Sequence, residues 1–135
     1  MTKKELAEVV AKAYNEMDMS ILESCLSEDF VYEMPSESFS LFRRLEEREG
    51  KKLKPFVYEY DKALYLHFQK MTFGVILKTS AEVSFSKCLN QIAVKLFWEG
   101  IYEGTLKIWK QGDRIVRMRQ CYLPEENGMT ETEEQ

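Results

Sequence analysis

The sequence predicts one α+β domain in which helices of the amino-terminal half pack on a strongly curved, mostly antiparallel sheet. In the first half, apolar residues recur at helical spacing, whereas in the second half they alternate with polar residues as strands do. Because helices come first and strands follow, the two kinds of element are expected to form an α+β fold. We expect this domain to span residues 1–124, before an acidic, apolar-poor and disordered tail over residues 125–135.

Composition narrows the classes of function. A chain of 135 residues suits one domain, and 44% apolar with 31% charged residues is an ordinary globular balance. The net charge of −4 disfavours a nucleic-acid-binding surface, which needs clustered cations. One histidine and three cysteines without a CxxC pair disfavour a zinc site and a disulfide framework, so we expect no metal and no cofactor. Since no segment resembles a signal peptide or a membrane span, we expect a cytoplasmic protein without a membrane partner.

The first elements are two helices and an aromatic strand. Apolar residues at helical spacing predict a helix over residues 2–17, with Thr2 as its N-cap ahead of Glu5. Ser20 is expected to cap a short second helix. Residues 30–34 are rich in strand formers and end at Pro35, which predicts a strand.

Residues 36–49 are ambiguous, because good helix formers coincide with alternating apolar residues. We favour an extended segment that ends in a turn at Glu49-Gly50. A third helix is predicted over residues 51–69, with Pro55 in its first turn, where the missing N–H costs little.

The second half is predicted to be sheet. Alternation indicates strands over residues 73–85, 92–98 and 101–109. The turn Gln111-Gly112-Asp113 then predicts a hairpin into a last strand through Val116 and Tyr122.

Three parts of the chain carry a family resemblance. They are the helices followed by Ser27-Glu28-Asp29 and the strand ending at Met34-Pro35, the turn Gly50-Lys51, and the run Gln111-Gly112-Asp113-Arg114-Ile115-Val116. Together they resemble the nuclear transport factor 2-like superfamily over residues 5–123. The resemblance implies a cystatin-like cone of the SnoaL-like and ketosteroid isomerase-like kind, in a bacterial protein. It implies no particular activity, because this fold carries both enzymes and non-enzymes.

The resemblance also bears on catalysis. Ketosteroid isomerase has its catalytic Asp directly before the proline that ends the first strand, and here that position is Met34. Its oxyanion-binding Tyr on the first helix corresponds to Val10, with Tyr14 one turn away. A thioether and an aliphatic side chain cannot transfer protons, so we do not expect isomerase chemistry. Scytalone dehydratase relies on pocket histidines, and this chain has His67 alone.

The cavity of this family lies between the helices and the concave face of the sheet. The residues that we expect to line a pocket for a small apolar or aromatic ligand are Tyr14, Tyr32, Met34, Tyr60, Trp98, Trp109, Met118 and Tyr122. The alternative is that these side chains only fill the core. Glu33 should point to the opposite face, toward solvent or a second copy, because strand side chains alternate.

Three functions are compatible with the sequence. The favoured one is a small-molecule-binding domain with an apolar, aromatic-lined pocket. The second is a non-catalytic interaction module that forms a homodimer through the outer faces of strands 89–98 and 101–110, with Phe97 and Tyr102 in contact. The third is a lyase or cyclase that uses His67, whose normal pKa suits proton transfer, or Tyr14. For His67 a structural or solvated role is the alternative, and for Asp18 we expect a capping role.

Overall fold

The computed structural model describes residues 1–36, 40–75, 78–86, 89–98 and 101–121. The elements in chain order are α1 (Lys3–Asn15), α2 (Ser20–Glu23), β1 (Leu26–Pro35), α3 (Ser40–Glu49), β2 (Val57–Asp61), α4 (Lys62–Val75), β3 (Thr79–Ser86), β4 (Gln91–Trp98), β5 (Ile101–Gln111) and β6 (Arg114–Cys121). The predicted tail over residues 125–135 and Tyr122 lie outside the described residues.

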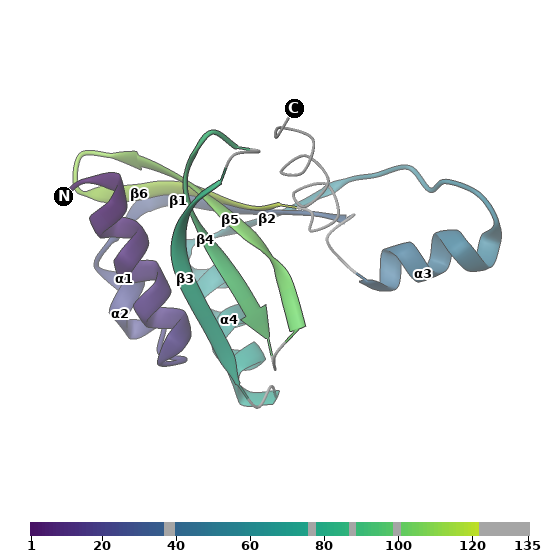
Figure 1. The fold of residues 1–135 in the computed structure, drawn as a ribbon, viewed down its shortest axis with the longest axis horizontal. Helices are drawn as coiled ribbons and strands as arrows, with labels where there is room; N and C mark the ends of the chain where they lie inside the picture. Colours follow the sequence, from purple (N-terminus) through teal and green to yellow (C-terminus); the bar gives the residue numbers. More distant parts are fainter. Residues whose placement is uncertain (37–39, 76–77, 87–88, 99–100, 122–135) are drawn as a thin grey trace.

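The six strands form one sheet in the order β2-β1-β6-β5-β4-β3. All neighbouring strands are antiparallel except β1 and β6, which run parallel. The sheet curves around α1 and α4, of which α1 packs on β3 and β4 and α4 packs on β1 and β2 (Figure 1). The predicted α+β class with a curved, mostly antiparallel sheet is therefore confirmed.

Helix α1 begins and ends with complete capping motifs. At its start, Thr2 and Glu5 form the predicted capping box, in which each side chain accepts a hydrogen bond from the other residue's backbone N–H. At its end, the backbone N–H of Met17 donates to the carbonyl of Tyr14, and that of Asp18 donates to the carbonyl of Ala13. This is a Schellman ending with Met17 at φ 53°, a left-handed position that glycine usually occupies. The chain therefore turns sharply at Met17 and enters α2.

The predicted cap of α2 is wrong. Ser20 is the first residue of the helix, and the residue before it, Met19, makes no side-chain capping bond. Asp18 instead accepts hydrogen bonds at Oδ1 from the backbone N–H and the hydroxyl of Ser20, at 3.0 and 2.7 Å. A carboxylate accepts both bonds more strongly than a hydroxyl would, so the capping role expected for Asp18 is the one that forms.

Two predictions in the middle of the chain are also wrong. Residues 40–49 form helix α3 rather than an extended segment, and α3 stands apart from the sheet and the other helices in Figure 1. The predicted helix over residues 51–69 is β2 followed by α4, which begins after Asp61, whose carboxylate accepts from the backbone N–H of Leu64 at 2.8 Å. Helix α4 continues to Val75, so Phe73 lies on a helix and not on the predicted strand. The apolar spacing predicted a helix, but Val57–Asp61 form a strand because they pair with the distant strand β1.

The last three strands agree closely with the prediction. The hairpin between β5 and β6 turns at Gly112, whose φ of 63° explains the glycine. Gly104 on β5 is needed for a different reason, because a Cβ there would lie 2.9 Å from the carbonyl oxygen of Cys121.

The core lies between the concave face of the sheet and helices α1 and α4. Its largest fully buried side chains are Tyr14, Tyr32, Tyr65, Phe30, Leu6, Leu22, Leu26, Leu96, Leu106, Ile108, Ile115 and Met118. Within the described ranges, no helix has both the length and the apolarity to cross a bilayer.

Candidate functional site

Three tyrosines form the centre of the core. Tyr14 of α1, Tyr32 of β1 and Tyr65 of α4 are each almost completely buried. The rings of Tyr32 and Tyr65 lie 4.6 Å apart between centroids, and Phe30 packs on Tyr65 at 5.3 Å. Such tilted ring pairs add to the stabilisation that their buried area supplies.

The three phenols are hydrogen-bonded inside the core. The hydroxyl oxygens of Tyr14 and Tyr65 lie 2.7 Å apart, and the Tyr32 hydroxyl donates to Oε1 of Gln120 at 2.9 Å. Burial is the main cause that raises the pKa of all three phenols well above the ordinary value. These groups are therefore neutral at physiological pH and can donate hydrogen bonds, but they cannot act as bases.

Two further polar atoms lie inside the domain. Oε1 of Gln69, one turn after Tyr65 on α4, and Oγ1 of Thr79 at the start of β3 are buried without a hydrogen-bond partner among the described residues. Buried polar atoms are nearly always paired, so these two atoms are exceptions inside the domain.

Several of the residues predicted from the sequence share this core. Tyr14, Tyr32, Met34 and Met118 are all buried on the concave side. Tyr60 lies on β2, opposite Tyr32 in the register, and its ring packs on Tyr32 at 5.8 Å. For Trp98 the backbone ends β4, and its side chain is outside the described part of the chain.

Trp109 was predicted to line the same pocket, and this is wrong. Ile108 points into the core, and because strand side chains alternate, Trp109 lies on the outer face of the sheet. There its ring is covered by Lys107 and Arg117. Glu33 does point to this outer face as predicted, but it is buried and ion-paired with Arg117 rather than open to solvent.

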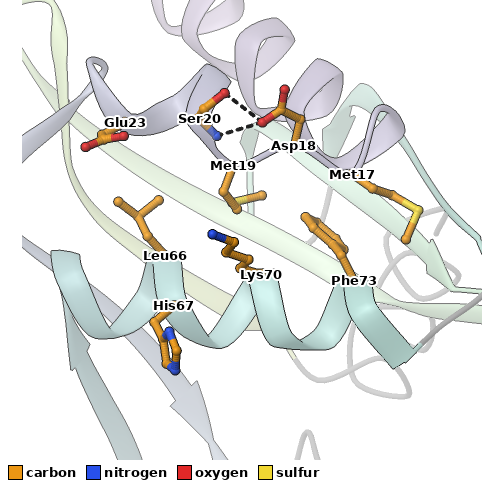
Figure 2. A pocket seen from close by; sticks show the side chains of 9 residues that line it. All are labelled: Met17, Asp18, Met19, Ser20, Glu23, Leu66, His67, Lys70 and Phe73. Carbon is orange, nitrogen blue, oxygen red and sulfur yellow. Dashed lines mark hydrogen bonds between the residues drawn. The ribbon is translucent and has the colours of Figure 1, made fainter.

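A cleft opens beside the tyrosine core, between the α1–α2 connection and α4 (Figure 2). Its volume is about 410 Å³. The residues that line it are Met17, Asp18, Met19, Ser20, Glu23, Leu66, His67, Lys70 and Phe73. The Schellman turn at Met17 shapes one wall, because it directs residues 17–23 across the face of α4.

The cleft has an apolar floor and a polar rim. Leu66, Lys70 and Phe73 project from α4 toward Met19, which itself is nearly buried (Figure 2). Phe73 links the cleft to the core, since its ring also packs edge-on against Tyr14 with the centroids 5.8 Å apart. Phe73 therefore lies between the cleft and Tyr14.

The ionisable groups of the cleft favour binding over proton transfer. Hydrogen bonds from Ser20 lower the pKa of Asp18, which keeps it an acceptor and not an acid. His67 borders the cleft, but its exposed ring lies on the side of α4 that faces away from Ser20 and Asp18 (Figure 2). Within the described ranges, no three His, Cys, Asp or Glu side chains converge to hold a metal ion.

Three cleft residues on α4 were missed in the sequence because this helix was predicted in the wrong place. Leu66, Lys70 and Phe73 follow one another at steps of four and three residues, which is the spacing of one helix face. Assigning Phe73 to a strand hid this pattern. Met17 and Met19 carry no signal of their own, since their positions depend on the turn between α1 and α2.

The surface proposed for homodimer formation is described only in part. Phe97 on β4 is half-buried, and the side chain of Tyr102 on β5 lies outside what the structure describes.

Comparison with known proteins gives a likeness of structure only. No family model matches the sequence, and no curated protein matches it significantly. A SnoaL-like protein of unknown function from Burkholderia thailandensis is 12% identical, with a TM-score of 0.57 over 89% of this chain and 92% of that one. A proposed polyketide cyclase from Streptomyces antibioticus is 14% identical, with a TM-score of 0.54 over 94% and 99%.

A designed protein with a curved β-sheet is also similar. It is 16% identical to this chain, with a TM-score of 0.55 over 98% of this chain and 96% of that one. At such identities the likeness shows the fold alone. The chain has the SnoaL-like, nuclear transport factor 2-like cone fold that its sequence resembles.

Proposed function

We propose that this domain binds a small, largely apolar molecule in the cleft between the α1–α2 connection and α4. The observation that carries the proposal is the cleft itself, whose volume of about 410 Å³ falls in the range of ligand sites. Its floor is built from Met17, Met19, Leu66 and Phe73. Thioethers and an aromatic ring adapt to flat apolar molecules, and the few polar groups on the rim would orient the ligand.

The tyrosine core supports the cleft from behind. Tyr14 packs against Phe73 and is itself held by its hydrogen bond to Tyr65. A ring fixed on one side by a buried cluster loses little freedom when a ligand covers its other side, which favours affinity. In this arrangement Tyr14, one of the aromatic residues predicted from the sequence, supports the wall of the site from behind, and Phe73 is the ring that contacts the ligand.

A catalytic role for His67 or Tyr14 has weaker support. The His67 ring is directed away from the centre of the cleft, and Tyr14 is enclosed behind Phe73. The likeness to a proposed polyketide cyclase concerns the fold and transfers no residue of that protein to this chain. Binding without chemistry is therefore the function that we propose.

A thermal-shift screen against flat apolar metabolites tests this proposal. A ligand that binds only the native state at about a hundredfold excess over its Kd adds about 2.7 kcal/mol to the free energy of unfolding. For a domain of this size that gain corresponds to a rise in Tm of several degrees. A hit is then repeated with Leu66→Trp, because Leu66 points into the cleft and an indole there would obstruct it.

The matched control is Leu64→Trp, the same substitution at an exposed position of the same helix. We expect the ligand-induced rise in Tm to disappear in Leu66→Trp and to persist in Leu64→Trp. A library that never raises Tm would argue against a binding function. If the rise survives Leu66→Trp but disappears in Tyr14→Phe, the ligand binds inside the cone and not in the cleft.

An interaction module is the second candidate, favoured by one specific observation. Phe56, Val57 and Tyr58 are exposed by 47, 41 and 43% of their surface where the edge strand β2 begins. An exposed apolar edge strand pairs readily with another strand. We therefore propose β2 as the contact of a homodimer, in place of the outer faces of β4 and β5.

Sedimentation over a range of protein concentrations tests the dimer. Val57→Lys should dissociate it, because an edge lysine prevents strand pairing. Phe85→Lys is the matched control, since Phe85 is 60% exposed on the opposite edge strand β3. A wild-type protein that stays monomeric at every concentration would contradict the proposal.

A further inference from the structure

A cluster of cations and one indole ring occupies the outer face of the sheet, on the side away from the helices and the cleft. Lys107 and Trp109 lie on β5, and Arg117 and Arg119 lie directly opposite Trp109 and Lys107 on β6. Glu33 on β1 completes the cluster, because it is opposite Arg119 on the other side of β6. We call these five residues the outer cluster.

Glu33 and Trp109 hold the cations in place. Arg117 donates from Nη2 to Oε1 of Glu33 at 2.9 Å, and Nε of Arg119 lies 3.5 Å from the same oxygen. The guanidinium carbon of Arg117 lies 4.1 Å from the centre of the Trp109 ring, and Nζ of Lys107 lies 4.7 Å from it. Cation–π contacts of this kind restrict long side chains at little cost.

Both arginine side chains are partly exposed. Their Nε atoms are buried, and the side chains as a whole are 41% exposed for Arg117 and 38% exposed for Arg119. A guanidinium is a planar fork of donors that fits two oxygens of one anion.

The cluster carries more positive charge than Glu33 can balance. Lys107 and Arg119 face each other across neighbouring strands, and like charges in such a pair destabilise a sheet. Within the described part of the chain, no carboxylate pairs with Lys107. The excess is local, because the whole chain has a net charge of −4.

We propose that the outer cluster binds a small oxyanion with two negative charges, such as a phosphate or a dicarboxylate, between Lys107, Arg117 and Arg119. The anion accepts hydrogen bonds from the two guanidinium groups and from the ammonium group. It thereby separates the like charges of Lys107 and Arg119, which the sheet register forces together. Glu33 acts as a positioning residue, because it orients Arg117 and does not touch the anion.

Titration with inorganic phosphate and with succinate at low ionic strength tests this inference. Binding is followed by calorimetry and by the NMR signal of the Trp109 indole N–H, which Trp109→Phe identifies among the two tryptophans of the chain. We expect a saturable shift of this signal with either dianion, and none with sodium chloride at matched ionic strength. A shift that chloride reproduces, or no saturable shift with either dianion, would overturn the inference.

Four variants distinguish binding at this site from a general effect of net charge. Arg119→Gln and Lys107→Gln should each weaken binding about tenfold or more, the loss expected when a charged hydrogen bond is removed. Lys110→Gln is the matched control, because it removes one positive charge from the exposed end of the same strand β5. Glu33→Gln should tighten binding, since the amide oxygen can still accept the hydrogen bond that orients Arg117 while the competing negative charge is removed. If Lys110→Gln weakens binding as much as Arg119→Gln does, anion binding depends only on net charge, and the proposed site is refuted.

Discussion

Raising the pH above 10 should unfold this domain in a way that reports on its three buried tyrosines. The pKa values of Tyr14, Tyr32 and Tyr65 are raised by burial in the folded state, whereas tyrosines of the unfolded chain ionise near pH 10. The unfolded state therefore releases these protons first as the pH rises. The stability that the three neutral phenols contribute is complete below about pH 10 and is lost as the pH rises toward their folded-state pKa values.

The size of the effect follows from the number of buried phenols. Each group that ionises only in the unfolded state lowers the free energy of unfolding by about 1.4 kcal/mol per pH unit. Three such groups give a slope of about 4 kcal/mol per unit, so about 4 kcal/mol is lost near pH 11. Because small domains have a total stability of about 5–15 kcal/mol, this loss removes a large part of the stability and brings a domain at the lower end of that range close to its unfolding midpoint.

Urea unfolding at a series of alkaline pH values measures the slope, and the near-ultraviolet absorbance of tyrosinate shows which rings ionise. We expect the three core tyrosines, among the seven in the chain, to stay neutral until the protein unfolds. Tyr32→Phe should reduce the slope by about a third, because one phenol no longer titrates. If all seven tyrosines ionise near pH 10 while the fold persists, water reaches these rings, and they line an open pocket instead of a packed core.

Three further substitutions test the local physics of the fold by urea unfolding at neutral pH. Thr2→Ala removes the capping box of α1 and should cost about 1 kcal/mol, whereas no loss would mean that the N-terminal turn frays in the native state. Gly104→Ala should cost about 1–3 kcal/mol, because its Cβ would meet a strand carbonyl at 2.9 Å, and a neutral result would show that β5 can move away from β6. Met17→Gly should relieve about 1 kcal/mol of left-handed strain while it weakens ligand binding in the cleft, so a large loss of stability would contradict the assigned backbone conformation.

Features that depend on neighbouring residues were predicted better from the sequence than elements that depend on distant ones. The capping box at Thr2 and the left-handed glycine at Gly112 depend only on neighbouring residues, and both formed where they were expected. Strand β2 depends instead on hydrogen bonds to β1, with Tyr60 opposite Tyr32. The apolar residues of 51–69 match a helix equally well, so a single-sequence pattern cannot separate the two structures there.

In the candidate site, too, some positions could be predicted from neighbouring residues and others could not. Strict alternation from the buried Leu106 and Ile108 places Trp109 on the outer face, so this error could have been avoided from the sequence. The burial of Tyr65 and the cleft along Leu66 and Phe73 could not have been predicted, because both require the true start of α4 at Lys62. That start is signalled only by the Asp61 cap, inside what looked like a continuous helix.

The position of the cleft follows from how α1 ends. The left-handed turn at Met17 sends the chain back across α4, and Asp18 then fixes the first turn of α2 through its two bonds to Ser20. A ligand in the cleft would therefore contact a segment held by backbone hydrogen bonds on one side and Phe73 on the other. Phe73 rests on Tyr14, so a ligand that displaces the Phe73 ring would change the packing against Tyr14 and, through it, the Tyr14–Tyr65 pair. This coupling means that alkaline titration of the core tyrosines should respond to a ligand bound outside the core, and the response should be absent in Leu66→Trp.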